Sequence, residues 1–147
     1  MNNHYSKRNM LPVIFGTMLL AVSCATISKF DQYSYTQATS IKVDALNVMS
    51  NASDSFQLHQ AEVTQVRTEL SKIFEYEKNK PDNITTTKMW SVMLDSTGGS
   101  FGGFLTRWRK ETKLDTTFIN ESKILVGESF DQISGLESGK IKATNYK

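Results

Sequence analysis

The side chain with the most distinctive chemistry is the thiol of Cys24, the only cysteine among the 147 residues. A deprotonated thiol is a nucleophile and a metal ligand, and it forms a disulfide when a second thiol is present. The chain offers no second cysteine, so an internal disulfide and a thiolate metal cluster are both excluded. Cys24 stands directly behind Ser23 and an apolar stretch at 10–22, so its chemistry must be interpreted together with that stretch.

The segment before Cys24 has the layout of a secretory signal. Lys7 and Arg8 precede the apolar stretch 10–22, which is followed by small residues at a cleavage-site-like position. The stretch is 13 residues long and contains a proline and a glycine. A membrane-spanning helix needs about 20 apolar residues, so this segment is too short for an uncleaved anchor.

Residues 20–24, Leu-Ala-Val-Ser-Cys, resemble the lipobox of bacterial lipoproteins. Ala21 stands where that motif prefers leucine, a replacement that the looser form of the motif accepts. The resemblance implies that a signal at 1–23 is removed and that Cys24 then carries acyl chains on its thiol and its new amino group. Three acyl chains would hold the protein on a bilayer permanently, because each buried CH₂ contributes about 0.8 kcal/mol. Ala25 stands where an aspartate would retain such a protein in the inner membrane, which implies an outer-membrane location, facing the periplasm or exposed at the surface.

The charge of the chain beyond the signal is balanced. The whole chain has 17 basic and 15 acidic residues, and removing Lys7 and Arg8 leaves 15 of each. A neutral chain with interspersed signs offers no electrostatic basis for binding nucleic acid. The expected partners are therefore the membrane, through the lipid on Cys24, and another protein of the cell envelope.

Apolar residues recur with helical spacing from about residue 31 to residue 78. Thirteen positions are spaced alternately by three and four residues, and ten of them are apolar, which predicts one long amphipathic helix. The Ser, Asn and Asp residues of 50–55 lower helix propensity, so we expect a bend there; the alternative is two helices with Asp54 as a cap. The stripe also allows a coiled coil, and hence a homo-oligomer through this first helix. The thirteen stripe positions are Tyr35, Ala38, Lys42, Ala45, Met49, Ala52, Phe56, His59, Val63, Val66, Leu70, Ile73 and Glu77.

Two shorter helices are expected in the middle of the chain. Pro81 ends the first helix, and a threonine of 85–87 is expected to cap a short helix that continues to about residue 94. The glycine-rich segment 95–103 predicts a loop or a close approach of two backbones. A second short helix is expected over 104–110.

A second long helix closes the predicted domain. Asp115 is the expected N-cap of a helix whose apolar residues recur at three- and four-residue spacing. Two long helices joined by short helices and a glycine-rich loop predict an all-α fold, a long antiparallel helical hairpin or bundle. We expect this domain to cover 31–139, after a short linker at 24–30 and before a flexible tail at 140–147.

The titratable residues of this domain show no pattern typical of catalysis or of metal binding. His59, the only histidine beyond the signal, falls on the apolar stripe, where a packed side chain is the expected role. Four carboxylates near the end of the first helix lack the spacing of a calcium loop, and we expect them to form a solvated face balanced by lysines. The glycines of 98–103 lack the spacing and the Lys-Ser/Thr ending of a phosphate-binding loop, so no cofactor is expected besides the lipid on Cys24. The four carboxylates are those of Glu69, Glu75, Glu77 and Asp82.

The densest group of aromatic and basic residues lies in the middle segment and is the candidate for partner binding. We expect Arg107 and Arg109 to reach solvent while Trp108 packs inward near Trp90. These features predict a non-enzymatic envelope lipoprotein that acts as a protein-interaction or accessory module. The alternative is a small-ligand-binding periplasmic lipoprotein with a pocket between the hairpin and the two tryptophans. The candidate residues are Phe101, Phe104, Arg107, Trp108 and Arg109.

Overall fold

The computed structural model describes residues 30–98 and 100–142, and this part of the chain forms five α-helices and no strand. The signal and Cys24 lie outside the described residues. Two short 3₁₀ turns, η1 and η2, separate the first two helices. The helices are α1 (Gln32–Ser50), α2 (Gln60–Lys78), α3 (Ile84–Leu94), α4 (Phe101–Glu111) and α5 (Thr116–Glu137), and the turns are η1 (Asn51–Ser53) and η2 (Phe56–His59).

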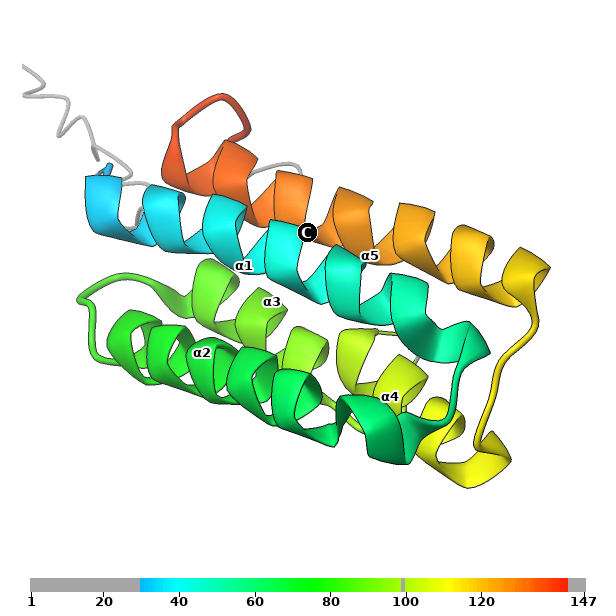
Figure 1. Cartoon of the computed structure of the whole chain (residues 1–147). Helices are drawn as coiled ribbons and strands as arrows, with labels where there is room; N and C mark the ends of the chain where they lie inside the picture. The colour runs from blue at the N-terminus through cyan, green and yellow to red at the C-terminus, as the bar shows by residue number, and fades with distance from the viewer. Residues whose placement is uncertain (1–29, 99, 143–147) are drawn as a thin grey trace, which may run out of the picture.

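The helices form an antiparallel bundle (Figure 1). Helix α1 packs against α5 and α2, and α3 packs against α2 and α5. The third member of this up-down-up-down arrangement is divided between α3 and α4, which follow one another toward the same end of the bundle (Figure 1). The expected all-α bundle is therefore confirmed.

The prediction of one long helix over 31–78 is wrong, because the chain breaks between α1 and α2. The break falls on the Ser, Asn and Asp residues whose side chains compete for backbone hydrogen bonds. It is fixed by the segment that precedes α5: Phe56 N donates to Thr112 O at 3.1 Å, and Leu114 N donates to Ala52 O at 2.8 Å. The alternative of two helices is right, although Asp54 caps neither of them.

The apolar stripe nevertheless keeps its phase through the break. Ten of the thirteen stripe positions are buried, and Tyr35, Lys42 and His59 are half-buried. Because α2 turns back against α1, the two halves of the stripe face the same interior instead of continuing along one rod. The spacing thus predicted which side chains are buried, although it did not predict the reversal of the chain.

Helix α4 begins at Phe101, three residues before the expected start, so Gly102 and Gly103 lie inside the helix. A Cβ on Gly102 would stand 2.6 Å from the backbone oxygen of Asp95, and a Cβ on Gly103 would stand 1.6 Å from that of Gly98. These two glycines therefore permit the first turn of α4 to pack directly on the backbone that follows α3. The close backbone approach predicted from the glycines is confirmed.

Aspartate side chains cap the N-termini of the first and last helices, α1 and α5. Asp115 accepts hydrogen bonds from the N–H groups of Thr117 and Phe118, which confirms it as the N-cap of α5. Asp31 caps α1 in the same way. Helix α3 follows Asn83 instead of starting at a threonine of 85–87.

The segment after α5 is docked on that helix as far as the structure describes it. Ile141 N donates to Gly135 O at 3.0 Å, and the Ile141 side chain occupies the space that a Cβ on Gly135 would need. Residues 143–147 of the predicted tail lie outside the described residues. Within the described part of the chain, none of the helices is both long and apolar enough to cross a bilayer.

Candidate functional site

Helix α4 carries all five residues of the candidate partner-binding site, and its two faces separate them. Phe101, Phe104 and Trp108 are buried, whereas Arg107 and Arg109 are exposed, as expected. The buried face packs on its neighbours through ring contacts, including Phe104 stacked on Phe118 of α5 at a centroid distance of 6.0 Å. The helix therefore exposes two guanidinium groups and buries its three aromatic rings.

Trp108 makes most of the contacts of the buried aromatic face and is completely buried. Its Nε1 donates to the backbone oxygen of Asp54 at 2.9 Å, which ties α4 to the turn between α1 and α2. Its ring lies 5.1 Å from that of Phe56 and 5.8 Å from that of His59. We expected Trp90 to lie near Trp108; the ring contact that Trp90 makes is with Phe130 in α5.

The two arginines have different surroundings. Arg107 Nε donates to Glu111 Oε1 at 2.9 Å, and its guanidinium lies 3.9 Å from the centre of the Phe118 ring. Arg109 lies 4.9 Å from the centre of the Phe56 ring and has no carboxylate partner among the described residues. Of the two, only Arg109 therefore keeps its full hydrogen-bonding capacity for another molecule.

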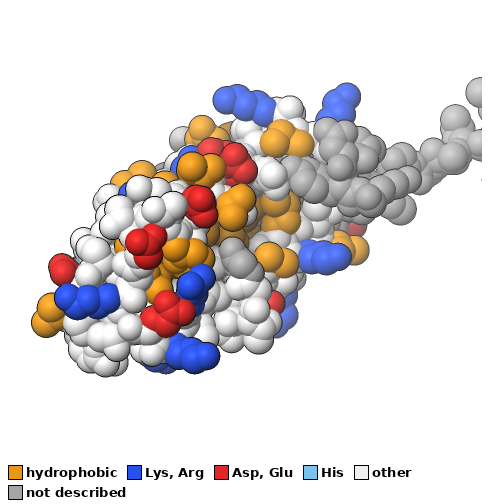
Figure 2. All heavy atoms as spheres, turned by 90° about the vertical axis from the view of Figure 1, so that its right-hand side faces the viewer, with side chains coloured by type: hydrophobic (Ala, Val, Ile, Leu, Met, Phe, Trp, Pro, Cys, Tyr) orange, Lys and Arg blue, Asp and Glu red, His pale blue; other side chains and the backbone are white. Residues whose placement is uncertain are grey.

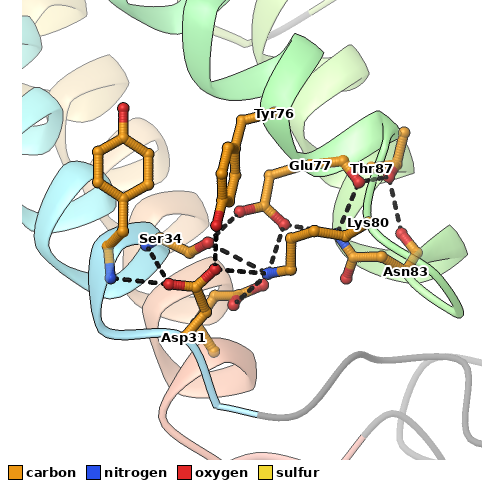
Figure 3. A network of polar contacts seen from close by, with 9 residues as sticks. Asp31, Ser34, Tyr76, Glu77, Lys80, Asn83 and Thr87 are labelled. Atoms are coloured by element: carbon orange, nitrogen blue, oxygen red, sulfur yellow. Dashed lines mark hydrogen bonds and ion pairs between the residues drawn. The ribbon is translucent and has the colours of Figure 1, made fainter.

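A network of polar side chains lies at the opposite end of the bundle and was not predicted from the sequence. We call it the Glu77 network (Figure 3). It joins the start of α1, the end of α2, the α2–α3 turn, α3 and the end of α5. Its members are Asp31, Ser34, Tyr76, Glu77, Lys80, Asn83, Thr87 and Glu137.

Lys80 holds two buried carboxylates in this network. Its Nζ lies 3.0 Å from Glu77 Oε2 and 3.0 Å from Glu137 Oε2. Glu77 and Glu137 are 0% and 2% exposed. Ser34 Oγ and Asn83 Nδ2 also donate to the Glu77 carboxylate. The expected solvated acidic face is therefore wrong for Glu77, whose carboxylate is enclosed and hydrogen-bonded on several sides.

The electrostatics of the network follow from its burial. Burial raises the pKa of Glu137, and the neighbouring charge of Glu77 raises it further, against the opposing effect of Lys80. Burial opposes the charge on Lys80, but its hydrogen bonds to Glu137 and Glu77 outweigh that effect and raise its pKa. At the rim, the hydrogen bond from the Tyr76 hydroxyl lowers the pKa of Asp31 and raises that of Tyr76 to about 12.

This arrangement is suited to fastening helices together. Glu77 accepts hydrogen bonds from Ser34, Lys80 and Asn83, whereas Glu137 accepts one from Lys80 through Oε2 and its Oε1 has no hydrogen-bond partner among the described residues. Both carboxylates are shielded from solvent. A general acid or a metal ligand must instead be reachable by its substrate or ion. Among the described residues, no group of three or more His, Cys, Asp or Glu side chains is placed to hold a metal ion.

No protein-family model, no curated protein and no solved structure matches this chain.

Proposed function

We propose that this protein is a lipid-anchored lipoprotein of the bacterial outer membrane that acts, without catalysis, as a protein-interaction or accessory module. The anchor is argued from the lipobox-like residues 20–24, with Cys24 as the acylated residue. Helix α1 is capped by Asp31, so only residues 25–30 separate it from the lipid. Six residues reach at most about 20 Å, and the end of the bundle that contains the Glu77 network would therefore lie close to the membrane.

The single observation that carries the interaction role is the division of α4 into a buried aromatic face and an exposed basic face. Arginine is enriched at the centres of protein interfaces, and a side chain whose position is fixed before binding loses less conformational entropy when it binds. Phe56 beneath Arg109 and Phe118 beneath Arg107 provide such fixed supports. The α4 end of the bundle would then face away from the membrane, toward a partner.

The surface favours recognition of a protein over recognition of a nucleic acid. Figure 2 shows the end of the bundle to which α4 belongs, with basic, acidic and hydrophobic side chains interspersed. A nucleic-acid site requires an extended field of positive charge, and a mixed surface does not provide one. The small-ligand alternative has less support. Trp90 and Trp108 were expected to border its pocket, but both side chains are fully buried and present no surface to a ligand.

The anchor is tested by replacing Cys24 with serine. The wild-type protein should incorporate labelled palmitate and partition into detergent, whereas Cys24→Ser should take up no label and remain an unprocessed precursor. Ser23→Ala is the matched control, because it keeps a small residue at the cleavage position and should be acylated as wild type. An unlabelled wild-type protein would show that the anchor is wrong.

The interaction role is tested separately with Arg107→Ala/Arg109→Ala in crosslinking or pull-down assays. The double variant should keep its helical content while its capture of the partner weakens. Loss of folding would assign these arginines to structure. Unchanged capture by a folded variant would exclude these arginines and leave the exposed face of α1 as the next candidate interface.

A further inference from the structure

We propose that a groove between α2 and α4 binds an acidic segment of the protein partner through Arg67 and Arg109. This inference rests on the proposed function, since it identifies the chemistry of the partner that α4 would bind. Arg67 was not among the residues singled out in the sequence. It joins the site only because the fold places α2 beside Arg109.

The groove has a volume of about 370 Å³ and a lining without any acidic residue. Five of its six lining residues come from α2, and Arg109 comes from α4. Two of the six are arginines, so the groove has a net positive charge although the chain beyond the signal is neutral. The lining residues are Val63, Thr64, Arg67, Thr68, Ser71 and Arg109.

Both arginines lack an ion-pair partner within the described chain. This distinguishes them from Arg107, which is paired with Glu111, and from Lys80, which is paired with two glutamates. A guanidinium presents five N–H donors in a planar array that matches the two oxygens of a carboxylate. The Phe56 ring beneath Arg109 fixes one of the two arrays, and Arg67 supplies the other.

The hydroxyl groups in the groove favour a peptide over a simple anion. Thr64, Thr68 and Ser71 each donate their hydroxyl hydrogen to a backbone oxygen four residues earlier on α2, at 2.8, 2.8 and 2.9 Å. Their oxygens are therefore left to accept hydrogen bonds from a ligand. A peptide with acidic side chains offers carboxylates to the arginines and backbone N–H groups to the hydroxyl oxygens. A fully deprotonated inorganic anion such as sulfate offers only acceptors and matches the arginines alone.

The test measures binding of a fluorescent, N-acetylated hexaglutamate peptide to the full-length protein in neutral detergent. Arg67→Ala/Arg109→Ala should raise the Kd about tenfold or more, because both carboxylate-binding groups are lost. Lys72→Ala/Lys88→Ala removes the same charge from exposed positions outside the groove and should change the Kd by less than about threefold.

Absence of peptide binding by the wild type would overturn the proposal, and so would any of three further results. The first is an equal loss of binding in the two double variants, which would show that only net charge matters. The second is displacement of the peptide by inorganic phosphate at equal charge concentration, which would identify a site for small anions. The third is arginine-dependent binding to phosphatidylglycerol vesicles without binding to the peptide, which would identify a membrane contact.

The variant Arg67→Ala separates a failure of this inference from a failure of the proposed function. If α4 crosslinks to a protein in cells and Arg67→Ala leaves that crosslink unchanged, the interaction role stands and the groove is not its site. If α4 crosslinks to no protein, the proposed interaction role itself fails. A crosslink that weakens in Arg67→Ala supports both.

Discussion

Replacing Lys80 by methionine should be among the most damaging single changes in the domain. Methionine is an unbranched side chain like lysine, so it removes the charge while leaving the space nearly filled. Loss of the Lys80 ammonium group would leave the carboxylates of Glu77 and Glu137 facing one another without a cation between them. Both carboxylates are shielded from water, which cannot take the place of the ammonium group.

The magnitude follows from this burial. Removing one member of a buried ion pair typically costs about 3–5 kcal/mol, because an unpaired charge remains in the interior. For a domain of this size, 1 kcal/mol corresponds to about 4 °C in Tm, so Lys80→Met should lower the Tm by about 12–20 °C at neutral pH. Lys78→Met is the matched control: Lys78 lies 3.6 Å from Glu75 with both side chains more than half exposed, and its loss should cost less than about 0.5 kcal/mol.

The assay is thermal unfolding followed by circular dichroism at several pH values. A carboxyl whose pKa is raised in the folded state binds more protons when folded, so its contribution to stability is present below the unfolded pKa and is lost as pH rises through the folded pKa. Glu137 has such a raised pKa even with Lys80 present, and removing Lys80 should strengthen this effect. The Tm difference between Lys80→Met and wild type should therefore be smaller at pH 5 than at pH 8. A variant as stable as Lys78→Met, or a penalty independent of pH, would refute the reasoning.

Three further predictions concern other parts of the bundle. Gly103→Ala should lower the Tm despite the better helix propensity of alanine, because the new Cβ would meet the backbone oxygen of Gly98 at 1.6 Å; an unchanged Tm would contradict the packing of α4. Trp108→Ala should cost about 3–5 kcal/mol in urea unfolding, since the ring is completely buried, and a cost below about 1 kcal/mol would contradict that burial. The pKa of Tyr76 is raised to about 12, so its contribution to stability is present below pH 10 and is lost as pH rises toward 12. Tyr76→Phe removes the hydroxyl bound to Asp31, so the fall in Tm at alkaline pH should be smaller in this variant than in wild type.

The fold was predictable where one local signal decided the outcome. The alternating three- and four-residue spacing identified the buried side of α1 and α2, and Asp115 marked the start of α5, because both depend on neighbouring residues alone. The reversal between α1 and α2 depends on backbone hydrogen bonds from Phe56 to Thr112 and from Leu114 to Ala52. Those partners are distant in sequence, so local propensity could indicate weakness at 50–55 but could not distinguish a bend from a turn.

The same distinction applies to the sites. The inward Trp108 and the outward arginines follow from the two faces of a short helix, and the sequence was sufficient to predict them. Glu77 occupies a stripe position, which was a signal of burial, yet its enclosure depends on Lys80 and on Glu137, a residue 57 positions beyond that lysine. Arg67 shows no sequence signal at all, because it becomes part of a groove only through the packing of α2 near α4.

The central claim is that a lipid-anchored bundle binds a protein through its α4 side. Its most direct test is photo-crosslinking in the native host, with a photoreactive residue at the exposed position Lys110 of α4 or, as a control, at Val43 on the exposed face of α1. We expect a discrete protein adduct from position 110 that disappears in the Cys24→Ser background, and none from position 43. Adducts from position 43 alone, or from neither position, would contradict it.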